Sequence, residues 1–205
     1  MKPDTDYKKR DLLLKAAKDE FVKKGYTKAS LRTICAKAGV TTGALYFFFE
    51  NKAELFAAVV DPPLNELKGL LTKYFIEDAK YLSSINSLDE LETGHNDASE
   101  LFTKCIYENH DVFRLLLTRS ENTVYENTLE DLSKLIESLI PSIVAAVPGY
   151  TYDPFMLEFM AHLSLDSYIN IIRREPSEKK AAEKLKKITY YLIRGWVRLV
   201  MIKEE

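Results

Sequence analysis

The chain has 205 residues, of which 46% are hydrophobic and 11% aromatic, and this composition is too apolar for a disordered protein. Its seven glycines and seven prolines separate long segments of helical periodicity, which predict an all-α protein. The net charge of −2 is unevenly distributed: residues 1–60 carry 12 Lys and Arg against 7 Asp and Glu, whereas residues 61–205 carry 17 against 24. A basic N-terminal part on an acidic body is typical of DNA-binding proteins. The alternative is a chance cluster of charges on a solvated face. The sequence starts without an apolar run and contains no stretch of about 18 apolar residues, so we expect a cytoplasmic protein without a membrane span. Its two cysteines lack metal-ligand spacing, and we expect no metal or cofactor.

The N-terminal part is predicted to be a three-helix head. Its first helix covers about residues 7–24 and ends at Gly25. Ser30 is a good N-cap for a second helix, Gly39 can supply the left-handed backbone of a tight turn, and Thr41 can cap a third helix over residues 42–49. Two short helices joined in this way form a helix-turn-helix, whose second helix enters the major groove of DNA.

A further helix follows the helix-turn-helix at once. Asn51 and Glu54 are spaced as a capping box that opens it. Lys52 lies in its first turn, where a cation opposes the helix macrodipole at a cost of about 0.3–1 kcal/mol. This placement is explained if a phosphate group binds there.

The remainder is predicted to be a larger helical body. Pro62 and Pro63 should interrupt the preceding helix, and we place the boundary between two domains there, at residues 1–61 and 62–205. A short helix capped at about Ser87–Asp89 is expected within the body. The other expected helices cover residues 63–82, 97–109, 112–117, 123–146 (with Pro141 kinking or ending it), 154–174 and 178–202.

The last two of these helices are joined by a short turn and should lie antiparallel as a hairpin. Both carry apolar residues on two sides. One side can pack on the body and the other on a second copy, or both can be buried in one protomer; periodicity leaves these alternatives open. The candidate residues of a dimer interface are Phe159, Leu163, Leu185, Ile188, Leu192, Trp196 and Leu199.

Two stretches of the head have specific patterns. Residues 39–56 fit G-V-[ST]-x-G-x-L-Y-x-x-F-x-x-K-x-x-L-[FL], and residues 10–26 fit R-x-x-[IL]-L-x-A-A-x-x-x-F-x-x-x-G-[YF]. In both, the chain resembles the TetR family of transcriptional repressors. Glu20 and Phe48 depart from the family, which usually has an apolar residue at the first position and His or Tyr at the second. The resemblance implies a homodimer whose helical body binds a ligand and thereby releases DNA.

The outward residues near the start of the second short helix should read DNA. Thr42 can hydrogen-bond a base, Ala44 and Phe47 can contact thymine methyl groups, and Arg32 can bind guanine with two hydrogen bonds. In the resembling family these positions contact bases. Thr41 is a cap or a contact, and Phe48 a contact or a packed side chain. The candidate DNA-binding residues are Arg32, Thr41, Thr42, Gly43, Ala44, Tyr46, Phe47, Phe48 and Lys52, of which Tyr46 and Lys52 hold phosphates in the family.

Aromatic residues of the body can line an apolar ligand pocket or simply fill the core. The pocket candidates are Phe75, Phe102, Tyr107, His110, Phe113, Arg114, Tyr125, Phe159 and His162. An enzyme is not expected, because His162 and Asp166, one helical turn apart, are not accompanied by a nucleophile elbow, a phosphate loop or a metal-binding motif.

The sequence therefore predicts a ligand-responsive repressor that binds a palindromic operator as a homodimer and is released by a small, largely apolar effector. Its expected partners are double-stranded DNA, a second copy of the chain and an effector that the sequence does not identify. The alternatives are a DNA-binding regulator without a small-molecule inducer and a helical interaction scaffold.

Overall fold

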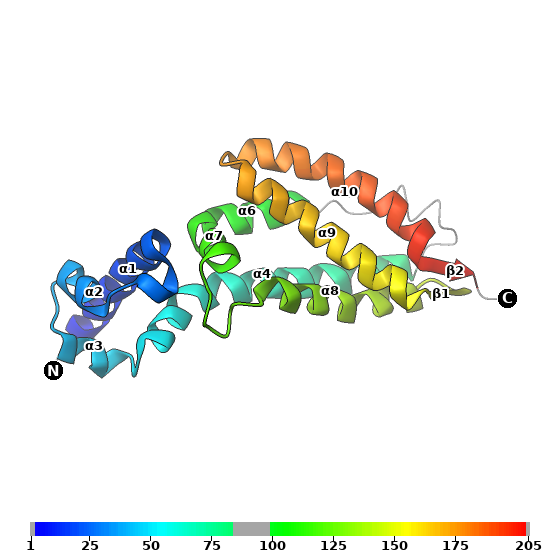
Figure 1. Cartoon of the computed structure of the whole chain (residues 1–205). Coiled ribbons are helices and arrows are strands. Elements are labelled where there is room, and N and C mark those ends of the chain that lie inside the picture. Colours follow the sequence, from blue (N-terminus) through cyan, green and yellow to red (C-terminus); the bar gives the residue numbers. More distant parts are fainter. Residues whose placement is uncertain (1–2, 84–98, 204–205) are drawn as a thin grey trace. The chain divides into compact units, whose positions relative to one another are not determined.

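The computed structural model describes residues 3–83 and 99–203, without the side chains of residues 3–5, Leu82, Ile193, Arg194, Trp196 and Val197. These residues form helices and one two-stranded antiparallel sheet (Figure 1). The helices are α1 (Pro3–Lys28), α2 (Leu31–Ala38), α3 (Thr42–Phe48), α4 (Lys52–Leu82), α6 (Ser99–Glu108), α7 (His110–Thr118), α8 (Thr128–Ala145), α9 (Pro154–Arg174) and α10 (Glu178–Val200); the strands are β1 (Tyr150–Tyr152) and β2 (Met201–Lys203). The predicted all-α class is confirmed. The helix expected at Ser87–Asp89 falls outside the described residues.

The chain divides into two compact units. The first unit contains residues 1–65 together with residues 109–128, and the second contains residues 66–108 and 129–205. α7 and the turn that follows it therefore belong with the N-terminal helices. No local pattern in the sequence indicates that residues 109–128 pack with the N-terminal helices. The division into a DNA-binding domain over 1–61 and a ligand-binding and dimerisation domain over 62–205 stays a prediction.

The first unit is held together by a buried apolar core with an aromatic centre. Phe21 and Phe56 are fully buried, and their rings meet edge to face with centres 5.0 Å apart. Gly25 has φ 75° and ψ 168°, so the regular part of α1 stops there, as predicted. The other large apolar side chains of this core include Leu13, Ile34, Leu45, Phe49, Leu55, Val60, Val112 and Leu116.

α4 corrects one prediction, because it runs through Pro62 and Pro63 without interruption. Each proline removes a backbone N–H donor and costs about 3 kcal/mol in a helix interior. The neighbouring Val60 and Leu64 are buried, and the hydrophobic free energy gained by burying them offsets this cost. In the same way Pro141 lies inside α8, which continues to Ala145 and does not end at the proline.

The second unit contains the predicted hairpin of α9 and α10, which lie side by side (Figure 1). α9 starts at the predicted cap, since the Asp153 carboxylate accepts hydrogen bonds from the next two helical N–H groups. The core of the second unit combines residues of α8, α9 and α10 with Val147, which follows α8, and Met201 of β2. Its other buried members are Ile140, Ile143, Val144, Leu157, Met160, Ala161, Leu192 and Val200.

The end of the chain differs from the prediction. α10 stops at Val200, and residues 201–203 form β2, which pairs with β1. The predicted end of the last helix at residue 202 was therefore wrong by two residues, and neither strand was predicted from the sequence. Pairing gives the backbone groups of both short segments hydrogen-bond partners, which a frayed helix end would lack.

Candidate DNA-binding site

Local hydrogen bonds build the turn between α2 and α3. The Ser30 hydroxyl accepts a hydrogen bond from the Thr33 N–H at 3.4 Å and caps α2. Gly39 ends α2 with φ 67° and ψ 28°, a left-handed conformation that glycine adopts without steric cost. The Thr41 hydroxyl accepts a hydrogen bond from the Ala44 N–H at 3.1 Å and starts α3. The predicted helix-turn-helix and its caps are therefore observed.

α3 presents an uncharged outer face. Leu45 and Phe49 are buried and fix the helix to the core. The Phe47 side chain is 67% exposed, and its ring packs edge to face on Phe48 with centres 5.0 Å apart. The remaining candidates also lie at or near the surface: Arg32, Thr41, Thr42, Gly43 and Tyr46 are exposed, and Ala44 and Phe48 are half-buried. Their contact with DNA stays a prediction.

The start of α4 differs in detail from the predicted capping box. The Asn51 side chain accepts a hydrogen bond from the Glu54 N–H at 2.9 Å, as expected. The Glu54 carboxylate, however, accepts a hydrogen bond from the Glu50 N–H rather than from that of Asn51. The helix start is thus capped by one of the two predicted bonds and fixed by a second bond one residue earlier.

Lys52 is held by neighbouring groups of the first unit. Its ammonium group lies 4.8 Å from the centre of the Tyr26 ring and donates a hydrogen bond to the Thr27 carbonyl at 3.2 Å. Partial burial lowers the pKa of this ammonium group below its ordinary value. An ammonium group has three N–H donors, so two remain for a phosphate.

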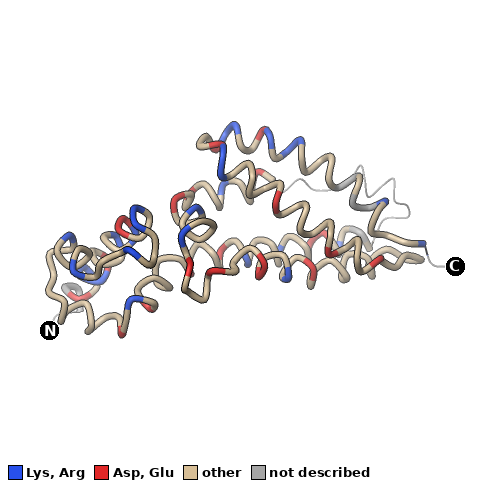
Figure 2. The backbone as a smooth tube through the Cα atoms, viewed as in Figure 1, with Lys and Arg blue, Asp and Glu red and all other residues tan. Residues whose placement is uncertain are grey.

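Most of the positive charge of the first unit lies on α1 and α2. Figure 2 shows Lys and Arg on α1 and α2, whereas α3 carries no charged residue. One of these cations is paired internally: the Lys37 ammonium lies 3.0 Å from the buried Glu20 carboxylate. The hydrogen bond from Lys37 holds the pKa of Glu20 below its usual value despite the opposing effect of burial. Glu20, which departs from the resembling family, thus links α1 to α2.

Residues 109–128 complete the unit that contains this site, and sequence reasoning missed them. The Arg119 guanidinium donates hydrogen bonds to the Val22 and Lys23 carbonyls at 3.3 and 3.2 Å. The Tyr125 hydroxyl donates a hydrogen bond to the Asp61 carboxylate at 2.6 Å. Burial and this bond raise the pKa of Tyr125. The partners are far apart in sequence, so no local pattern could have revealed them.

Residues 13–59 match the model of the family described as "Bacterial regulatory proteins, tetR family". This part of the chain is therefore similar to the TetR family. The matched family is a class of transcriptional regulators and not of enzymes, which agrees with the expectation that this chain is not an enzyme. The matched residues coincide with the helix-turn-helix and the two helices around it.

The chain is also similar to individual transcriptional regulators. The HTH-type transcriptional regulator TtgR of Pseudomonas putida is 44% identical over 52 residues, which are 25% of each chain. The uncharacterized HTH-type transcriptional regulator YfiR of Bacillus subtilis is 26% identical over 101 residues, which are 49% of each chain. The matches span half the length of these curated relatives or less. The crystal structure of a transcriptional regulator from Aquifex aeolicus aligns with 90% of this chain and 99% of its own chain, with a TM-score of 0.63 and 19% identity. This similarity concerns the fold.

The nine predicted pocket residues are divided between the two units. His110, Phe113, Arg114 and Tyr125 belong to the first, and Phe75, Phe102, Tyr107, Phe159 and His162 belong to the second, so no pocket within one unit is lined by all nine. Phe102 and Phe113 are buried, in agreement with the alternative that these aromatic residues fill the core. Ligand binding by the others stays a prediction.

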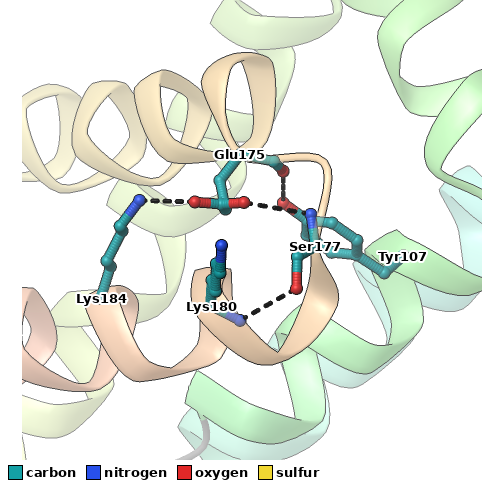
Figure 3. A network of polar contacts seen from close by, with 5 residues as sticks. All are labelled: Tyr107, Glu175, Ser177, Lys180 and Lys184. Atoms are coloured by element: carbon teal, nitrogen blue, oxygen red, sulfur yellow. Dashed lines mark hydrogen bonds and ion pairs between the residues drawn. The ribbon is translucent and has the colours of Figure 1, made fainter.

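Tyr107 and His162 have structural partners in the second unit. The Tyr107 hydroxyl donates a hydrogen bond to the Glu175 carbonyl at the turn between α9 and α10 (Figure 3). The Glu175 carboxylate accepts a hydrogen bond from Lys184 at 2.6 Å, and this bond lowers the pKa of Glu175. His162 Nε2 lies 3.6 Å from a Glu137 carboxylate oxygen. Tyr107 thus joins α6 to the turn between α9 and α10, and His162 of α9 lies close to a carboxylate of α8.

The second unit has an open groove of about 560 Å³ that the sequence did not predict. Its lining contains three lysines and none of the nine pocket candidates: Lys68, Gly69, Thr72, Lys73, Ile76, Glu77 and Lys80 of α4 and Leu135 of α8. Among the described residues no group of three or more His, Cys, Asp and Glu could hold a metal ion. Within the same part of the chain, no helix has the length and apolar character needed to cross a membrane.

The candidate interface residues of α9 and α10 differ in exposure. Leu185 and Leu192 are buried within the protomer and are therefore removed from the predicted interface. Phe159 is 50% and Leu163 40% exposed on α9, in line with Phe155, which is 71% exposed. Of the other candidates, Leu199 is exposed, Ile188 is half-buried, and the side chain of Trp196 lies outside the described residues.

Proposed function

We propose that this chain is a cytoplasmic transcriptional regulator that binds double-stranded DNA through α3. The observation that carries the proposal is the geometry of α3. Its buried side fixes it to the core, while Thr42 and Phe47 at the other side are free to enter a major groove. The match of residues 13–59 to the model of the tetR family supports the same function.

The DNA-binding form is a homodimer that recognises a palindromic operator. One helix-turn-helix makes few contacts, and two copies related by a two-fold axis place two recognition helices about 34–36 Å apart. The exposed apolar stripe of Phe155, Phe159 and Leu163 on α9 supports an interface between copies, because solvent exposure of such a stripe is unfavourable. Phe159→Arg is therefore expected to yield monomers in sedimentation equilibrium, whereas Tyr7→Arg, a change at an exposed residue of the first unit, leaves dimers.

The function is tested by selecting duplexes from random-sequence DNA with the native protein. We expect two inverted half-sites about one helical turn apart and binding that weakens steeply with salt. Arg32→Ala and Phe47→Ala should each weaken binding to the selected duplex by at least about tenfold, since one good base contact contributes about 1–3 kcal/mol of discrimination. Absence of any enriched duplex would exclude the function.

The regulator responds to a small, largely apolar effector that binds the helical body and releases DNA. Such a ligand acts only if it binds the released state better than the DNA-bound state. Support comes from the size of the second unit, which exceeds what an interface of two helices requires. A regulator without an inducer is the second candidate, favoured by the burial of Phe102 and by the structural contacts of Tyr107 and His162.

A further inference from the structure

We propose that Arg119 is a positioning residue for DNA binding, which acts through Tyr26 on Lys52 and makes no contact with DNA itself. This inference rests on the proposed function and deepens it, because it assigns a role in the DNA-binding unit to a residue outside the helix-turn-helix. It depends on a continuous series of contacts from the end of α7 to the start of α4, all within the first unit.

Arg119 is joined to the end of the regular part of α1 by three hydrogen bonds. Its guanidinium donates to the Val22 and Lys23 carbonyls, and its own carbonyl accepts a hydrogen bond from the Tyr26 N–H at 3.1 Å. Those two carbonyls lie in the last turn before Gly25, where helix carbonyls lack intrahelical partners. A fixed cation there also interacts favourably with the negative end of the helix dipole.

Gly25 brings the two segments close enough for these bonds. A Cβ atom added at Gly25 would lie 3.1 Å from the Arg119 Cβ and 3.4 Å from its carbonyl oxygen. The backbone of Arg119 therefore packs directly against the α1 break. The position of Tyr26, the next residue, depends on this packing and on its hydrogen bond to the Arg119 carbonyl. The guanidinium bonds to the Val22 and Lys23 carbonyls hold the Arg119 backbone in that place, and Arg119→Ala removes them.

Tyr26 transmits this position to α4. Its ring meets Phe56 with centres 5.1 Å apart, and its face carries the Lys52 ammonium group at 4.8 Å. The neighbouring Thr27 carbonyl accepts the hydrogen bond from the same ammonium group. A shift of the segment after Gly25 would thus remove both contacts that orient Lys52, and an unoriented lysine loses more side-chain entropy when it binds a phosphate.

The test is a double-mutant cycle on the duplex selected with native protein, with the dissociation constant measured as a function of salt concentration. Lys52→Ala should lower the slope of log K against log salt by about 1.8 per dimer, from one phosphate contact per protomer. Arg119→Ala should weaken binding about tenfold and lower the slope toward that of Lys52→Ala. The double variant should bind like Lys52→Ala alone.

Two further variants separate positioning from stability. Arg119→Lys should restore part of the affinity, because one ammonium group can still bind a carbonyl. Glu121→Ala, at an exposed position in the same turn, should bind like native protein. All measurements are made at temperatures where circular dichroism shows each variant folded. A native slope for Arg119→Ala, or a full additional loss in the double variant, would overturn the proposal.

A measurement without DNA distinguishes this inference from the proposed function. The pKa of Lys52 can be followed through its Cε carbon by NMR. It should rise toward 10.5 in Arg119→Ala, because a released ammonium group becomes better hydrated. An unchanged pKa would refute the positioning role even if DNA binding is intact, whereas a native protein that binds no duplex would refute the function and leave this result standing.

Discussion

Replacement of Gly25 by alanine tests the packing of α1 against Arg119 most severely. The residue has φ 75° and ψ 168°, a region that is essentially restricted to glycine and costs about 1–3 kcal/mol for other residues. The added methyl group would also lie 3.1 Å from the Arg119 Cβ, closer than an ordinary van der Waals contact, so the backbone of one segment must move. Both effects destabilise the folded state.

The expected loss for Gly25→Ala is therefore about 1–3 kcal/mol, which corresponds to a decrease of about 2–12 °C in Tm for a chain of this size. Thermal unfolding followed by far-UV circular dichroism measures it. Gly69→Ala is the matched control, because Gly69 lies in α4 with open space around it and alanine should stabilise the helix by about 0.8–1 kcal/mol. If Gly25→Ala unfolds at or above the native Tm, the strained turn and its packing against Arg119 are not as described.

Three other predictions concern hydrogen bonds. Tyr125→Phe removes only the hydrogen bond to the Asp61 carboxylate and should lower the free energy of unfolding in urea by about 1.5 kcal/mol. This is the low end for a bond to a charged group, because Tyr125 is half-buried. An unchanged urea midpoint would contradict the bond. Below about pH 4.5 the free energy of unfolding should fall as the pH falls, because Lys37 lowers the pKa of Glu20 in the folded state and the unfolded state therefore takes up the proton first. Glu20→Gln should make this decline shallower. An equally steep decline in the variant would refute the role of the Glu20–Lys37 pair. Asp153→Ala should cost about 1 kcal/mol by uncapping α9, and a smaller loss than about 0.3 kcal/mol would show that the cap contributes little.

The parts of the fold that depend on local chemistry could be predicted from the sequence. The caps at Ser30, Thr41 and Asp153 and the turn at Gly39 all follow from one residue type and its immediate neighbours, and the structure has each of them. The outward side of α3 follows from helical periodicity once Leu45 is assigned to the core. These local rules are sufficient to define the recognition element.

The parts that depend on tertiary packing could not be predicted. Arg119 binds a carbonyl 97 residues away, and Glu20 binds Lys37 across 17 residues, distances over which no sequence period operates. The intrinsic cost of a proline predicts a helix break at Pro62, whereas the burial of its neighbours, which offsets that cost, depends on tertiary packing. The same limit applies to Lys52: its unusual place in a helix start was evident, but its contact with the Tyr26 ring was not.

The central claim is that the exposed side of α3 enters a DNA groove, and chemical footprinting of a selected duplex tests it most directly. Dimethyl sulfate footprinting of major-groove guanines, with native protein and with Thr42→Ala and Phe47→Ala variants, reports which bases the protein covers. We expect protection in two inverted half-sites about one turn apart, which the α3 variants reduce at the same bases in both halves. Protection that is absent, or that is identical in native protein and both variants, would contradict the claim.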